Sequence, residues 1–401
     1  LFLENAKGLS MGKTRNNLRF NQASIGNLNL SSQFMPNFGE LVKANVGAWL
    51  HIPQGQFTDS NTTFKWYNAR FTNSSRTLSL DSFVYHPTQP LDSVLENAPY
   101  ELDYITLKTG GVTIDGLDVA RYERDSSIIV NSIKITAPLL TVYRDKLPPS
   151  SPNKRDKPLP VNMIKNISFP LLIDSIQFED GTIIYSEKHG KSRKQGDLLL
   201  SKVSGILTNI KNRDLQNNDS LSLLFKAKFM DAAPMVVHLK ESYTDSLAGF
   251  FLSAKVAGVD LSILNPVLLP FSNIKITSGT LDSMSFTAVG REDVAFGEMD
   301  MHYKKFRIKL IKNGDPDQST FLQHIASFIT NTFIIRSKNT RRKGVIFYDH
   351  SSDQSFVNYL VKITLSGIST SLGVKKNTKF MKQYKQELKE SNHPRVNLNL
   401  E

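Results

Sequence analysis

The sequence predicts a mostly β fold with a few short amphipathic helices near its C-terminus. Three observations lead to this fold class: short stretches in which apolar and polar residues alternate, a recurring strand–break–strand unit, and apolar residues at helical spacing beyond residue 318. Alternation with a period of two is typical of strands that bury one face, and turn residues bound these stretches at close intervals. A chain of 401 residues allows two or three domains.

The recurring unit reads apolar-x-apolar-x-x-small-x-apolar. It occurs at residues 105–112, 176–183 and 274–281 with glycine at the small position, and in weaker form at 133–140 and 18–25. We expect each copy to form a strand, a break and a second strand, because glycine accepts the left-handed or bulged backbone that redirects a chain. The copies are unevenly separated, so a regular solenoid is not expected.

Composition divides the chain into four parts. Two β-rich sections, residues 1–145 and 161–374, flank residues 146–160, which contain five prolines. Proline at this density predicts an extended surface loop between the two sections. Residues 375–401 form a Lys-rich tail, which we expect to begin as a helix and to end disordered.

Two apolar helices are predicted in the C-terminal section. Residues 319–333 and 356–372 both place apolar side chains at helical spacing, and Ser319, at the start of the first segment, can cap that helix. A strand is expected between them, at residues 344–349. The stretch before that strand is basic, and its Arg336, Arg341, Arg342 and Lys343 are our candidates for contact with an anionic surface.

The residue inventory points away from catalysis. The chain has no cysteine, which excludes disulfides, thiolate metal sites and a cysteine nucleophile. Its eight histidines are scattered and it has no G-x-S-x-G pattern, so we expect no catalytic residue, no metal site and no cofactor. The formal net charge of +12 favours anionic partners, but no recognised nucleic-acid-binding motif accompanies the basic stretch, and nucleic acid is not an expected partner.

Several segments together resemble AsmA-like proteins, in particular the large set found in Bacteroidetes. The resemblance covers residues 162–374 well and 18–143 more loosely. The matching segments are FPLLIDSIQFEDGTIIY (169–185), LNP (264–266), IKITSGTLDSMSF (274–286), GEMDMHY (297–303), NTFIIR (331–336), FVNY (356–359) and LSGISTSLG (365–373). These motifs are structural, and they are specific as a group rather than singly.

The resemblance implies a curled antiparallel β-sheet that forms an apolar groove, related to bridge-like lipid-transfer proteins. It further implies non-enzymatic binding or transfer of phospholipid, or another acyl lipid, in support of outer-membrane integrity in a Gram-negative bacterium. The apolar positions of the repeats are the candidates for lining the groove, although the same residues would equally fill a closed core. They are Ile105, Leu107, Ile176, Phe178, Ile183, Ile274, Ile276 and Leu281.

AsmA-like proteins extend into the periplasm from an N-terminal helix in the inner membrane. This chain starts at Leu1 and has no run of 18 apolar residues, so we expect any such anchor to lie upstream. At roughly 12 residues per strand and turn the chain supplies about 30 strands at most, too few for one copy to cross the envelope. The sequence leaves open an envelope scaffold that binds an assembly protein through a sheet edge without carrying lipid.

Overall fold

A single sheet of 18 strands dominates the structure, a computed structural model that describes residues 2–8, 17–27, 45–149, 151–152, 156–188, 194–245, 249–272, 274–310 and 337–373, with 377, 379, 381, 382 and 386. The strands are β1 (Phe2–Gly8), β2 (Asn17–Gly26), β3 (Trp49–Thr58), β4 (Thr62–Thr72), β5 (Thr77–Leu80), β6 (Ser82–Pro87), β7 (Leu102–Lys108), β8 (Val112–Asp115), β9 (Ile128–Thr136), β10 (Leu139–Asp145), β11 (Leu171–Lys188), β12 (Gln195–Lys211), β13 (Ser220–Phe229), β14 (Ala233–Ser242), β15 (Phe250–Asp260), β16 (Ile274–Gly290), β17 (Val294–Leu310) and β18 (Lys343–Asp349). The helices are α2 (Leu91–Glu96), α3 (Val119–Asp125), α4 (Pro160–Lys165), the short 3₁₀ helix η1 (Leu261–Leu264), α5 (Asn265–Ser272) and α7 (Phe356–Leu372). The predicted mostly β fold with a few short helices is confirmed.

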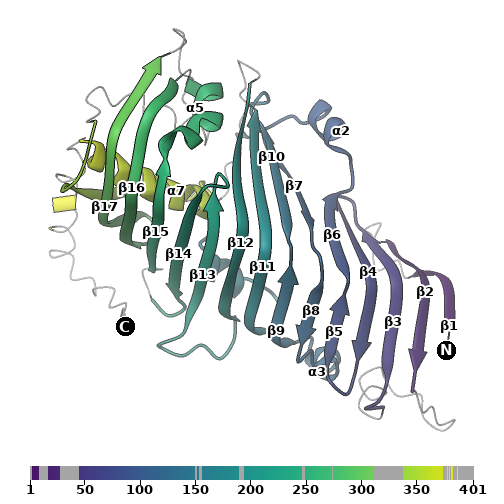
Figure 1. Cartoon of the computed structure of the whole chain (residues 1–401). Coiled ribbons are helices and arrows are strands. Elements are labelled where there is room, and N and C mark those ends of the chain that lie inside the picture. Colours follow the sequence, from purple (N-terminus) through teal and green to yellow (C-terminus); the bar gives the residue numbers. More distant parts are fainter. Residues whose placement is uncertain are drawn as a thin grey trace.

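The strands follow one another in space in the order in which they occur in the chain (Figure 1). We call each line of backbone across the sheet a rung, and in three places two short strands together make up one rung. Strands β5 and β6 form the first such rung, and both pair with β4. Strands β8 and β7 form the second and pair with β5 and β6, whereas β9 and β10 form the third, pair with β8 and β7, and both pair with β11. The 18 strands therefore make fifteen rungs (18 − 3). At about 4.8 Å per rung the sheet is roughly 70 Å long.

One junction in this otherwise antiparallel sheet is parallel. Strands β9 and β10 both run parallel to β11, and the chain between them, residues 146–170, contains the proline-rich loop and α4. A crossover of this length returns the chain to the end of the sheet from which the previous rung started. The described residues of the predicted surface loop are exposed or half-buried except for Leu159, which is buried in the main core with 2 % of its surface accessible. The sheet continues without a gap across this boundary.

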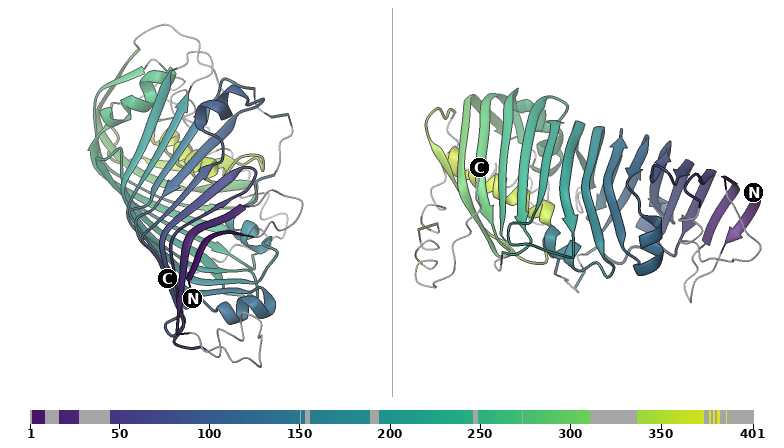
Figure 2. Two further views of the ribbon diagram at one scale, coloured as in Figure 1. Left: turned by 90° about the vertical axis from the view of Figure 1, so that its right-hand side faces the viewer. Right: turned by 90° about the horizontal axis from the view of Figure 1, so that it is seen from below.

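A line of backbone irregularities crosses the sheet at mid-height and bends the rungs. It runs through Asn68, Ala137, Asp180 and Lys202, all with positive φ, and through the break at Gly110 between β7 and β8. It returns in β16 and β17, where the register shifts on both sides of Ser278. Three copies of the recurring unit cross this line. Residues 105–112 form the expected strand, break and second strand, β7 and β8. Residues 176–183 and 274–281 instead lie within the continuous strands β11 and β16, where the register shifts near the glycine and no break separates two strands. The end-on view in Figure 2 shows the resulting bent cross-section.

Helices α4, α5 and α7 lie on one face of the sheet, which we call the inner face. Residues of η1, α5 and α7 form the main core with β14–β18, and Val161 of α4 belongs to a second cluster with Val130, Ile173 and Ile210. Helix α5 contacts both β12 and β16, which extend beyond the shorter β13, β14 and β15 between them. In Figure 2, α7 lies in the hollow of the bent sheet.

The LNP motif of the sequence has a clear structural role at α5. The Asn265 side chain accepts a hydrogen bond from the Ile276 amide (2.8 Å) and donates one to the Ile276 carbonyl (3.1 Å). This pair of bonds fixes the first residue of α5 to β16.

Helix α7 also covers the edge of the last strand. The Thr370 hydroxyl accepts from the Val345 amide (2.7 Å) and donates to its carbonyl (2.8 Å), and Ser366 does the same with Phe347 (3.0 and 2.7 Å). Two hydroxyls one helical turn apart thus take the place of a neighbouring strand for β18. Exposed strand edges invite pairing with other chains, and this edge is blocked.

The predicted C-terminal elements agree with the structure where it describes them. The strand expected at 344–349 is β18, and the helix expected at 356–372 is α7, capped by Ser355. The helix expected at 319–333 lies outside the described residues, as does most of the tail.

Candidate functional site

A continuous row of apolar residues crosses the inner face from β2 to β18. Each member pairs directly with the next, so all of them lie on one face and at one height. We call this row the apolar ladder. Its members are Ile25, Leu50, Phe71, Leu78, Ile114, Ile133, Ile176, Leu207, Leu223, Leu239, Leu252, Ala288, Gly297 and Ile346.

A second apolar row runs beside the ladder, above the line of bends. It joins β2 to β14 without a polar member other than the hydroxyl of Tyr85. Its members are Leu18, Phe57, Phe64, Tyr85, Leu107, Leu140, Ile183, Leu200, Phe229 and Ala233. The two rows lie on either side of the bend, so the hollow has apolar walls on both sides.

Coverage of the ladder changes along its length. From β2 to β13 its side chains are only half-buried, whereas Leu239, Leu252, Ala288 and Ile346 are buried beneath the helices. The opposite face of the same strands carries exposed polar residues, for example Lys134, Gln177, Lys226, His238 and Glu298, although the exposed Trp49 of β3 also lies there. A contiguous apolar surface on one face of a sheet is typical of ligand-binding grooves and of interaction sites.

A cavity of about 300 Å³ opens at the α7 end of the inner face. A row of four register partners forms its floor: Met235, Val256, Met284 and Met301. Helix α7 supplies the other wall through Val361, Leu365, Ile368 and Leu372. Tyr303 and Thr364 are the two lining residues with a polar side-chain atom. The size is at the lower end of the range for ligand sites, and the lining suits a hydrocarbon chain.

The structure brings the candidate groove residues of the repeats to the inner face. Ile176 belongs to the ladder, and Leu107 and Ile183 belong to the second row. Phe178 lies two residues after Ile176 on the same face, with the centre of its ring 6.3 Å from that of Phe225. Ile105 is 37 % exposed, and Leu281 lines the cavity.

Two candidates differ from this group. Ile276 is 1 % exposed and packs in the main core with α5, so it serves the core rather than an open surface. Ile274 is the first residue of β16, and its side chain lies outside the described residues.

The four basic candidates do not form one patch in the described part of the chain. Arg342 donates to the Ser371 carbonyl at the end of α7 (3.0 Å), and Lys343 pairs with Glu298 (3.5 Å) on the strand beside it. Arg341 is exposed, and Arg336 lies outside the described residues.

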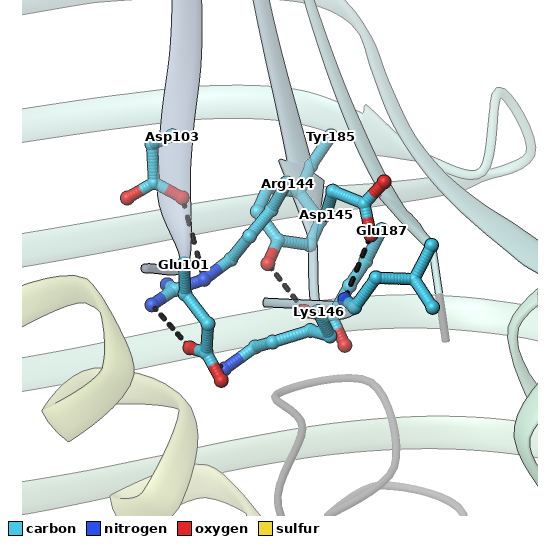
Figure 3. A network of polar contacts seen from close by, with 8 residues as sticks. Glu101, Asp103, Arg144, Asp145, Lys146, Tyr185 and Glu187 are labelled. Atoms are coloured by element: carbon cyan, nitrogen blue, oxygen red, sulfur yellow. Dashed lines mark hydrogen bonds and ion pairs between the residues drawn. The ribbon is translucent and has the colours of Figure 1, made fainter. Parts of the chain in front are cut away.

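Sequence reasoning missed a row of charges at the upper end of the inner face, shown in Figure 3. Asp103, Arg144 and Glu187 are register partners, two positions beyond Ile105, Val142 and Tyr185 on the same strands. Lys146 binds Glu101 at 2.6 Å, and the Tyr185 hydroxyl donates to Glu187 at 2.5 Å. The side chains of Asp103 and Arg144 are 41 % and 29 % exposed. Burial and the neighbouring Glu187 raise the pKa of Tyr185, so this hydroxyl keeps its proton.

A buried acid on β14 was also missed. Glu241 is 1 % exposed on the inner face, close to α4, and neither carboxylate oxygen has a hydrogen-bond partner of ordinary geometry among the described residues. Burial raises its pKa to about 7, against the opposing influence of the Val161 amide and the Lys165 ammonium. Both of those groups belong to α4.

Replacing this acid with its neutral isostere should remove a pH dependence of stability. The raised pKa means that the fold favours the protonated form of Glu241. The contribution of this group to the unfolding free energy is therefore fully present below pH 4.5 and is lost as the pH rises through 7. Glu241→Gln should match the wild type near pH 4 and exceed its unfolding free energy at pH 8 by up to about 3 kcal/mol. Urea denaturation at both pH values measures this, and a constant difference between the two proteins would contradict it.

No protein-family model matches the chain, and no curated protein matches it significantly. Among the described residues, no helix is long and apolar enough to span a membrane. That same part of the chain contains no group of three or more His, Cys, Asp or Glu side chains placed to hold a metal ion.

Proposed function

We propose that this chain is a non-enzymatic, AsmA-like envelope protein that binds or transfers an acyl lipid, such as phospholipid, along its inner face. The apolar ladder carries the proposal, because fourteen consecutive register partners make one apolar row, and its nine members from β2 to β13 are half-buried with no second sheet over them in the described part of the chain. The cavity under α7 supports the proposal, because it is a site where one acyl chain of a lipid can be enclosed.

The energetics suit a reversible carrier. Each buried methylene contributes about 0.8 kcal/mol, so about ten methylenes contribute roughly 8 kcal/mol before the cost of ordering the chain. A lipid tail spans half of a hydrocarbon core that is about 30 Å thick, and hence about three rungs of the sheet. The ladder therefore offers several adjacent positions for one tail, and similar free energy at each of them permits movement along the sheet.

The place of action follows from the same proposal. We place the protein in the periplasm of a Gram-negative bacterium, tied to the inner membrane by a segment upstream of this chain and supporting the outer membrane. A sheet of roughly 70 Å carries lipid over part of that distance, so transfer would involve further copies or envelope assembly proteins.

Native mass spectrometry of protein purified under mild conditions, with extraction and identification of its lipids, tests this function. Phospholipid or another acyl lipid bound in stoichiometric amount is the expected result. Protein that is free of lipid and also fails to take up fluorescent phospholipid from vesicles would contradict the proposal and favour a scaffold that binds protein alone.

A further inference from the structure

Arg144 differs from the charged residues beside it on the inner face because its guanidinium has N–H donors that make no hydrogen bond in the described part of the chain. Its guanidinium makes two ion pairs, from Nη2 to Glu101 at 3.6 Å and from Nε to Asp103 at 3.4 Å. Neither is short enough for a good hydrogen bond, and Nε is buried without a hydrogen-bond partner in the described part of the chain. A guanidinium carries five N–H donors in a fixed fork.

Two of the three acids near Arg144 already accept a short hydrogen bond from another residue. Glu101 accepts from Lys146 at 2.6 Å, and Glu187 accepts from Tyr185 at 2.5 Å. Asp103 has Arg144 as its ion-pair partner among the described residues, at 3.4 Å, and its side chain is 41 % exposed. The row thus presents one cation with unused donors beside one accessible carboxylate (Figure 3).

This pair lies at the end of the apolar surface. On their antiparallel strands, Asp103 lies two residues before Ile105 and Arg144 lies two residues after Val142, so both are about 7 Å farther up the same face. The adjoining Tyr185 pairs with Leu198, which lines the cavity. A lipid tail lying on the apolar rows would therefore bring its headgroup within reach of Arg144.

We infer that Arg144 and Asp103 bind the headgroup of a zwitterionic phospholipid, with its phosphate on the Arg144 fork and its ammonium on Asp103. This inference rests on the proposed function and specifies its substrate class. Arginine forks match the geometry of phosphate oxygens. The accessible carboxylate beside the fork opposes a headgroup with only negative charge and favours one that also carries a cation.

Competition between lipids with the same acyl chains tests the inference. The protein is incubated with vesicles containing equal amounts of phosphatidylethanolamine, phosphatidylglycerol and diacylglycerol, reisolated, and its bound lipids are counted by native mass spectrometry. We expect the wild type to prefer phosphatidylethanolamine. Arg144→Gln should lower the ratio of phospholipid to diacylglycerol about tenfold, and Asp103→Asn should lower the ratio of phosphatidylethanolamine to phosphatidylglycerol.

Arg70→Gln is the matched control, because Arg70 is an exposed arginine that is hydrogen-bonded to Asp81 (3.0 Å) on the opposite face. Its lipid ratios should equal those of the wild type. Wild-type ratios in Arg144→Gln would overturn the headgroup site while leaving the groove intact. Absence of all three lipids from the wild type would instead overturn the proposed function. Equally tight binding of soluble glycerophosphoethanolamine would make this a site for a soluble phosphate ester, which also contradicts the inference.

Discussion

Phe178→Glu should remove most of the bound acyl lipid from the protein. The side chain lies on the inner face beside the apolar ladder, where its ring contacts Phe225 and its register partner is Gly205. A carboxylate there places a charge against any tail that crosses β11, and an unpaired charge in an apolar contact is costly. Lipid extraction with quantification per protein molecule measures the loss.

Two further variants separate this effect from unfolding. Gln177→Glu introduces the same charge at the adjacent, exposed position on the opposite face, and it should keep the lipid content of the wild type. Ile105→Glu changes an inner-face side chain that is already 37 % exposed, so its stability should change little while its lipid content falls. If Phe178→Glu and Ile105→Glu bound as much lipid as the control Gln177→Glu, the assignment of a lipid groove to the inner face would lose its support. Ile276 is unsuitable for this test, because a charge in the main core would unfold the protein.

Gly367→Leu should detach α7 from the sheet. A Cβ at this position would lie 2.7 Å from Met299 Cε and 2.9 Å from Ile346 Cγ1, so the helix could not keep its approach to β17 and β18. Overpacking of this kind costs about 3 kcal/mol. The loss would expose the core beneath α7 and free the edge of β18 from Ser366 and Thr370.

The expected signs are a lower melting temperature, increased binding of a dye that reports apolar surface, and self-association that grows with protein concentration. Val357→Leu is the control, because Val357 is on the same helix and is 65 % exposed. A Gly367→Leu protein that melts with the wild type and remains monomeric would show that α7 does not hold this edge closed.

Much of the fold could be predicted from the sequence because its signals are local. Period-two alternation gives the strands, the glycines of the recurring unit mark the bends at Gly110 and Gly181, and helical spacing gives α7. The register between strands is not local. Nothing in the sequence shows that Ile114, Ile133 and Ile176 pair in succession, and the continuity of the ladder depends on that pairing.

The polar features of the inner face were missed for the same reason. Asp103 and Arg144 look like ordinary surface charges until the pairing of β7 with β10 places them together beyond the apolar rows. Glu241 follows Leu239 by two positions, and this spacing assigns it to the buried face, but acids usually occupy exposed positions. The hydroxyls of Ser366 and Thr370 acquire their role only when α7 meets the edge of β18.

Photocrosslinking with a labelled lipid tests whether acyl chains lie on the inner face of the sheet. The protein is incubated with vesicles that contain phospholipid with a photoreactive group in the acyl chain, irradiated and digested, and the modified residues are identified by mass spectrometry. We expect adducts along the apolar ladder and the second row, on strands from both sections of the sheet. Adducts confined to the polar face, or an absence of adducts on folded protein, would contradict this expectation.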